Sequence, residues 1–235
     1  MTKNASAAEP TISLIEELCL LAIGDDGAVA PVTSDLEFGM GIIGSCLVEL
    51  CLRGRLDAEL RETTEGEPPQ AVVWVTDSNP VGEPALDRVL LAISRGPVQS
   101  VETWAKELLP IAPELLRMAL ARLETRGVIA AKDERIFWVL KSRRYPVIEG
   151  RELREAKLRI VDVLIGGSFP SPHDSVLIGL ALISHVLSHI FSDEELRRLE
   201  PRINEVSSLD IVARAVEVAI SDEIQRRVQA FPLSV

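Results

Sequence analysis

The segment Met40–Leu52 restricts the fold of this 235-residue chain more than any other. It is apolar around nearly the whole circumference of a helix, and its chief interruptions are Ser45 and Glu49. A helix that is apolar on all sides is stable in water only when other elements surround it. The segment is shorter than the roughly 20 residues that a membrane span needs. We therefore predict a central, buried helix around which the rest of the chain packs.

Helical periodicity recurs on both sides of this segment. Aromatic residues make up only 4% of the chain, and Ala, Leu, Ile and Val supply most of its apolar 47%. That mixture favours helix packing over a β-sandwich. Caps or glycines end several of the periodic segments, as Gly127 does. The further predicted helices are residues 11–23, 84–93, 101–109, 113–126, 151–165, 175–191 and 211–227.

Two short hairpins complete the predicted fold. Residues 55–61 and 71–76 read as strands around a polar loop, and residues 128–140 read as a second hairpin. The charged run Lys132–Arg135 is the expected tip of the second. The predicted fold class is all-α, a mainly helical single domain over residues 11–235 with one or two small β-hairpins. Residues 1–10 are expected to form a flexible N-terminus.

The expected compartment is the cytoplasm. The first ten residues are polar and lack the apolar core of a signal peptide. Cys19, Cys46 and Cys51 form neither a metal-ligand spacing nor an even disulfide framework, so buried, reduced thiols are expected.

No motif in the sequence predicts catalysis, a cofactor or a metal. Residues 39–44 match G-x-G-x-x-G, but the strand that a dinucleotide site requires does not precede them. We interpret these glycines as positions where helices approach closely. His185 and His189 are spaced i, i+4 on a predicted helix, but a third metal ligand is not evident. Paired carboxylates such as Glu16 and Glu17 are expected in turns or on helix faces.

Charge is distributed unevenly along the chain. Residues 113–159 contain twelve Lys/Arg and seven Asp/Glu, a net +5, so the other residues carry −16 of the total −11. Such an asymmetry indicates a surface for an anionic partner, although solvated helix faces produce it too.

Two interpretations of the basic region remain open. A helix followed by a hairpin is typical of a winged-helix DNA-binding protein, with helix and wing-tip cations meeting phosphates. Those cations would be Arg117, Arg122, Arg126, Lys132 and Arg135. Alternatively, Phe137 and Trp138 lie in an apolar run beside the basic stretch Lys141–Arg144, which suits the interface of an anionic membrane. A buried strand with a solvated basic tail would give the same pattern.

Several motifs, in order, resemble the Golgi phosphoprotein 3 family of phosphatidylinositol-4-phosphate-binding adaptors and their bacterial relatives. The motifs are Leu14–Ile23, Leu47–Leu56, Pro80–Asp87, Leu123–Ile129, Leu164–Gly167 and Asp174–His185. The resemblance implies a mainly helical domain with a protruding hairpin. It also implies headgroup contacts from a Trp, an Arg and a second Arg pair. Those positions align here with Ser34, Ile43, Pro113 and Leu116.

The predicted function is that of a cytoplasmic peripheral adaptor, which binds anionic phospholipid headgroups without catalysis. The candidate headgroup contacts are Arg117, Lys141, Arg143 and Arg144, and the candidate membrane-interface residues are Phe137 and Trp138. A protein partner or a second copy is expected at the hairpin of residues 128–140. No nucleic acid is expected, and a winged-helix-like regulator is the alternative.

Overall fold

The computed structural model describes residues 12–24, 26–29, 35–62, 69–136, 140–148 and 150–207. Of residues 35, 132–136 and 140–143 it describes the backbone alone. Helices predominate, and strands are confined to two small antiparallel sheets. The expected mainly helical fold is confirmed. The predicted flexible N-terminus, residues 1–10, lies outside the described residues.

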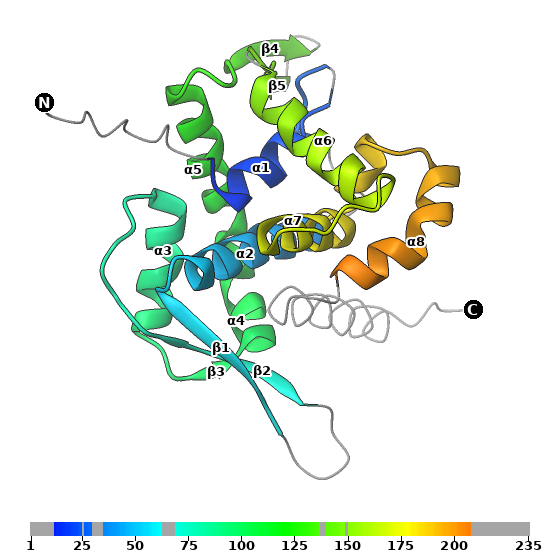
Figure 1. Ribbon diagram of the computed structural model, residues 1–235. Coiled ribbons are helices and arrows are strands. Elements are labelled where there is room, and N and C mark those ends of the chain that lie inside the picture. Colours follow the sequence, from blue (N-terminus) through cyan, green and yellow to red (C-terminus); the bar gives the residue numbers. More distant parts are fainter. Residues whose placement is uncertain are drawn as a thin grey trace, which may run out of the picture.

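Helix α2 (Asp35–Leu52) is the centre of the molecule (Figure 1). Met40, Ile43 and Leu47 on it are fully buried, and α2 packs against α1 (Leu14–Leu21) and helices from later in the chain. The predicted central helix is confirmed, and it begins at Asp35 rather than at Met40. Because α2 has no polar face, it is stable in water only when other elements enclose it on all sides.

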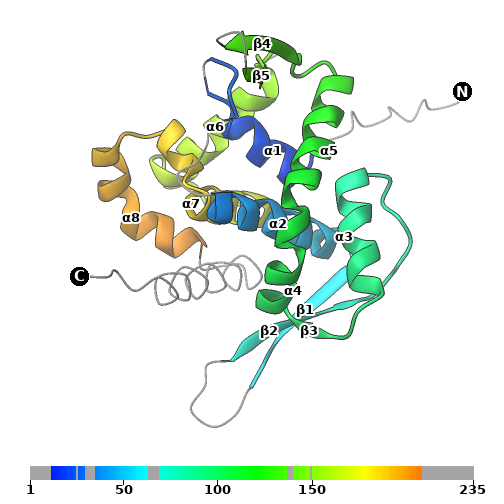
Figure 2. The ribbon, with the colours of Figure 1, turned by 180° about the vertical axis from the view of Figure 1, so that it is seen from behind.

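The remaining helices surround α1 and α2 (Figures 1 and 2). These surrounding helices are α3 (Pro84–Ser94), α4 (Val101–Leu108), the 3-10 turn η1 (Leu109–Ile111), α5 (Ala112–Thr125), α6 (Arg151–Leu164), α7 (Pro172–Ile183), the 3-10 turn η3 (Val186–His189) and α8 (Asp193–Ser207). Most of the α-helices agree with the predicted segments to within one or two residues.

Two helix predictions need correction. The segment 175–191 is not one helix, because His185 adopts a left-handed conformation with φ 56° between α7 and η3. His185 and His189 therefore do not share a helix. Helix α8 was not predicted, because it is rich in charge and contains Pro201, which cannot donate a helical hydrogen bond. The predicted helix 211–227 lies outside the described residues.

The first sheet contains β1 (Leu56–Arg61), β2 (Gln70–Val75) and a two-residue strand, β3 (Gln99–Ser100), in that order. β1 and β2 form the predicted hairpin, with Leu56 opposite Val75 and Arg61 opposite Gln70. β3 was not predicted, because two residues are too few to show the alternation of apolar and polar residues that indicates a strand.

The second hairpin is confirmed, but it lies further along the chain than predicted. Its strands are β4 (Lys132–Ile136) and β5 (Leu140–Arg144), so the run Lys132–Arg135 is part of a strand and not the tip. The hairpin lies at one end of the molecule, beyond α5 and beside the start of α6 (Figures 1 and 2).

The glycines of residues 39–44 lie within α2, and two of them bring neighbouring elements close. A Cβ added at Gly41 would lie 1.9 Å from Oγ of Ser184 at the end of α7, and one added at Gly39 would lie 2.9 Å from Cδ1 of Leu109. This confirms the interpretation of the motif as a close approach between helices.

Replacement of Gly41 tests this crossing. We expect Gly41→Ala to lower the free energy of unfolding by about 1–3 kcal/mol, because the added methyl group overpacks the contact with Ser184. Part of this loss should disappear when Ser184→Ala removes the obstructing hydroxyl. Gly150→Ala is the matched control, since nothing lies within 4 Å of that position. Urea unfolding measures Gly41→Ala, Gly41→Ala/Ser184→Ala and Gly150→Ala, and equal losses at Gly41 and Gly150 would contradict the packing.

Candidate functional site

Glu16 and Glu17 of α1 are buried, with 1% and 3% of each residue exposed. The pair lies on a helix face, as expected, but that face is directed into the molecule. A buried carboxylate is tolerated only when cations and hydrogen bonds compensate it. The two side chains are therefore the centre of an ionic cluster inside the helical assembly.

The Glu16 side of the cluster links α1, α5 and the start of α3. The Glu16 carboxylate accepts a hydrogen bond from the backbone N–H of Ser13 at 2.9 Å, which caps the start of α1, and it pairs with Arg122 of α5 at 2.6 Å. Arg122 also contacts Glu83, the residue before α3, at 3.1 Å. Arg126, one turn further along α5, approaches Glu16 to 3.4 Å.

The chain of contacts returns to α1 through α2. Arg53, which follows α2, bridges Glu83 and Glu49. Glu49 accepts a hydrogen bond from the backbone N–H of Leu14 at 3.0 Å. Ion pairs thus connect Glu16, Arg122, Glu83, Arg53 and Glu49 in that order, and the backbone of α1 closes the circuit. We call these five residues the ion-pair ring. It joins the N-terminal turn of α1 to α2, to α5 and to the start of α3.

Glu17 forms a second branch towards α6 and α7. Its carboxylate contacts Nη2 of Arg159 and Nε2 of His173, each at 2.6 Å. Arg159 also binds Asp174 at 2.8 Å, and Asp174 donates its backbone N–H to the N-cap hydroxyl of Ser171. Ser171 is thus the N-cap of α7. The hydrogen bond to Glu17 raises the pKa of His173 although burial opposes its charge.

Two local features of the sequence mark residues of this cluster. Ser13 and Glu16 have the S-x-x-E spacing of a capping box, and Glu49 interrupts an otherwise apolar helix. Each indicates a carboxylate that needs a partner. The identity of the partners follows only from the fold, because Arg122 and Arg159 are more than 100 residues from α1.

The candidate headgroup residues do not form one cluster. Arg117 lies on the exposed side of α5. Lys141 and Arg143 are two positions apart on β5 and so belong to one face of the hairpin, whereas Arg144 belongs to the other. The Arg144 guanidinium lies 2.5 Å from the Asp26 carboxylate in the loop after α1.

The two candidate interface residues, Phe137 and Trp138, lie outside the described residues. In the sequence they fall between Ile136, the last residue of β4, and Leu140, the first residue of β5. The base of the hairpin is better defined. The N–H of Tyr145 donates to the carbonyl of Gly27 at 2.6 Å, and Gly27 has φ 74° with no room for a Cβ beside Pro146.

The arginines of α5 decide between the two interpretations of the basic region. Arg122 and Arg126 contact Glu16 and thus point into the molecule. Neither is available to nucleic-acid phosphates without breaking its contact with Glu16. Of the three α5 cations in the winged-helix interpretation, Arg117 alone is exposed, which argues against that alternative.

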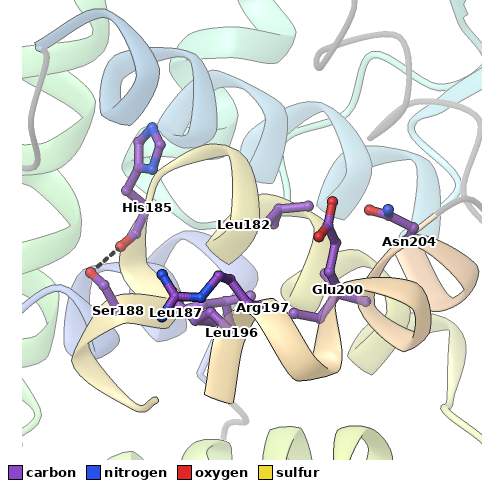
Figure 3. Close-up of a pocket in the computed structure, with 9 residues that line it drawn as sticks. Leu182, His185, Leu187, Ser188, Leu196, Arg197, Glu200 and Asn204 are labelled. Atoms are coloured by element: carbon purple, nitrogen blue, oxygen red, sulfur yellow. Dashed lines mark hydrogen bonds between the residues drawn. The ribbon is translucent and has the colours of Figure 1, made fainter. Parts of the chain in front are cut away.

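A pocket of about 320 Å³ lies between the end of α7, η3 and α8 (Figure 3). Leu182 and Leu187 contribute apolar walls, while Arg197 and Glu200 extend in different directions (Figure 3). His185 lines the pocket as well. Within the described residues, no group of three side chains gathers that could hold a metal ion. None of the candidate headgroup residues lines this pocket.

One protein-family model matches most of the chain. The model of the Golgi phosphoprotein 3 (GPP34) family matches residues 14–222, from the start of α1 to beyond α8. The chain belongs to the Golgi phosphoprotein 3 family. No curated protein matches it significantly. Within the described residues, no helix has both the length and the apolar character to cross a membrane.

The structure describes three of the four positions aligned with the headgroup contacts of the Golgi phosphoprotein 3 family. Ile43 is buried in α2, Leu116 packs against the core from α5, and Pro113 is exposed in the first turn of α5. Ser34 lies outside the described residues. The three described positions therefore carry no charged side chain.

Loss of Arg122 should destabilise the fold strongly. Arg122→Met leaves Glu16 and Glu83 buried with fewer cations, and we expect a loss of about 3 kcal/mol in the free energy of unfolding. Arg117→Met on the exposed side of the same helix is the control and should change stability by less than about 0.5 kcal/mol. Urea denaturation compares them; similar losses would show that the ion-pair ring contributes little.

His173 should make stability depend on pH. Its folded-state pKa is raised above the unfolded value of about 6.5, so its contribution is complete below that pH and declines as pH rises through the folded-state pKa. The stability difference between wild type and His173→Gln should therefore shrink from pH 6 to pH 9. His189→Gln, outside the cluster, should show no such trend. A difference that grows with pH would contradict the assigned contact.

Proposed function

We propose that this member of the Golgi phosphoprotein 3 family is a peripheral adaptor that binds anionic phospholipid headgroups through the β4–β5 hairpin. The observation that carries the proposal is the position of Lys141 and Arg143. Both belong to one face of a two-stranded sheet at the end of the molecule, and neither strand is part of the helical core. Arg117 adds an exposed cation on α5, the helix that leads to the hairpin.

Electrostatics favour one orientation at an anionic surface. The net +5 of residues 113–159 includes the hairpin, and the rest of the chain carries −16. An anionic leaflet attracts the first and repels the second, so the hairpin end faces the membrane. Each Lys or Arg near such a surface contributes about 1 kcal/mol, and this contribution falls off within a Debye length. Binding should accordingly be weak, roughly micromolar or poorer, and sensitive to salt.

The proposed adaptor has no catalytic role. Cys19 and Cys46 are buried, and burial raises the pKa of each thiol far above neutrality, which keeps both protonated. The imidazole of His173 is held by Glu17. These side chains are therefore occupied in the core and poorly placed to attack a substrate.

Vesicle co-sedimentation tests the binding surface. We expect the wild type to bind vesicles containing phosphatidylserine and Lys141→Glu/Arg143→Glu to bind at least tenfold more weakly. Arg95→Glu/Arg198→Glu is the matched control, because it changes the net charge equally at exposed sites outside the hairpin. Equal weakening of both variants would mean that net charge, and not the hairpin, controls binding.

Headgroup specificity is expected to be low. Ile43, Pro113 and Leu116 cannot pair with a phosphate as arginine does, so phosphatidylinositol 4-phosphate should bind no better than other anionic lipids at equal surface charge. Titration with charge-matched vesicles measures the ratio. A preference of tenfold or more for the phosphoinositide would refute this part of the proposal.

A further inference from the structure

Helix α6 has an apolar outer face as well as an apolar inner face. Ala156, Ile160 and Val163 are buried against the core. On the opposite side, Leu158 is 65% exposed and Ile165, which caps the helix, is 54% exposed. These two residues are seven positions apart, so they lie above one another on the same side of the helix. Two large aliphatic residues on one side of a helix form an exposed apolar strip, which marks an interaction surface where further apolar side chains adjoin it.

Phe169 extends this apolar face beyond the end of α6. Its side chain is fully exposed, at 100%. The loop that carries it is held in place, because Arg202 of α8 donates hydrogen bonds to the carbonyls of Ser168 at 3.0 Å and Val163 at 3.4 Å. The ring is therefore displayed from a fixed backbone, with contacts on both sides of the turn after α6.

Cations lie at the other end of the same face. Arg151 and Arg154 are exposed in the first turn of α6, and Arg154 precedes Leu158 by four residues, on the same side of the helix. Exposed Ile148 lies just before them. α6 begins beside the β4–β5 hairpin and runs across the outside of α1 (Figure 1). The outer face of α6 thus continues from the basic hairpin into an apolar end.

We propose that the outer face of α6, formed by Arg151, Arg154, Leu158, Ile165 and Phe169, is a membrane-docking face that inserts shallowly into an anionic bilayer. This inference rests on the proposed function and adds the apolar contact to it. An amphipathic helix with cations beside exposed aliphatic and aromatic residues suits the boundary between headgroups and acyl chains. Three acidic residues belong to this helix. Glu152 pairs with Arg151 at 3.6 Å, and Glu155 and Asp162 border the row of Leu158 and Ile165 on one flank, where they remain in the aqueous layer.

A bilayer fits this face better than a second copy of the chain. The aliphatic residues form a single narrow row, and the aromatic ring stands out from a loop at its end. Such a surface is too small for a stable protein interface, which buries about 800 Å² on each partner. An anionic leaflet, in contrast, attracts both cations of the face.

Substitution of the apolar residues tests the docking face. We expect Ile165→Ser/Phe169→Ser to bind phosphatidylserine vesicles at least tenfold more weakly than the wild type at every salt concentration, with an unchanged salt dependence. Leu91→Ser/Val98→Ser is the matched control, because these exposed apolar residues lie on other elements, and it should bind within twofold of the wild type. Circular dichroism and thermal unfolding should be unchanged in all of them, since the replaced side chains are about half exposed or more.

Depth measurement provides a second readout. Phe169→Trp should add fluorescence that is quenched by brominated lipids in the shallow part of the acyl region, whereas Val98→Trp should add fluorescence that is not quenched. Absence of quenching at position 169 in a chain that binds vesicles would overturn the inference.

The outcomes separate the two proposals. If the wild type fails to bind any anionic vesicle, the proposed function falls and this inference falls with it. If the wild type binds, depends on Lys141 and Arg143, and is unaffected by Ile165→Ser/Phe169→Ser, the docking face alone is refuted. A wild-type dimer in sedimentation velocity that these two substitutions dissociate, with vesicle binding unchanged, would assign the face to a second copy and likewise refute the inference.

Discussion

Two adjacent buried carboxylates on α1 determine how the rest of the molecule is assembled. Glu16 and Glu17 are part of a helix that packs against α2, α5, α6 and α7. Removing their charges from water costs several kcal/mol each unless cations reach them. Arg122 of α5 and Arg159 of α6 meet this requirement from opposite sides. The apolar core is compatible with more than one tight packing of these helices, but a packing that left either carboxylate without its arginine would be strongly destabilised.

The same constraint shapes the outer surface. Arginines that would otherwise enlarge a basic patch are used inside the molecule, as Arg122, Arg126 and Arg159 are. The net positive charge of residues 113–159 therefore overstates what an external ligand meets. Among the described side chains of residues 113–159, the exposed cations are Arg117 on α5 and Arg151 and Arg154 at the start of α6. Inward pairing thus narrows the surface that we propose for an anionic partner.

Membership of the Golgi phosphoprotein 3 family and the loss of charged residues at its headgroup positions are compatible. Ile43 and Leu116 take part in packing, and packing preserves the fold whether or not a phosphate binds nearby. A general attraction to anionic lipid needs only exposed cations and apolar side chains at one end of the molecule. We propose that the hairpin and the outer face of α6 supply this attraction without a headgroup pocket.

The sequence by itself determined the central helix, most of the surrounding helices and both hairpins. Apolar periodicity and turn residues are local signals, and Gly39 and Gly41 even marked where helices approach. The same local signals misplaced Lys132–Arg135 at the tip of the hairpin. They also missed α8, because its many charged residues and Pro201 hide the apolar periodicity of a helix. Only the tertiary structure decided which charges are buried. Glu16 and Arg122 are 106 residues apart, and no local pattern relates them. Whether an arginine faces a carboxylate or the solvent depends on which helices become neighbours, and that is settled by packing of the whole chain.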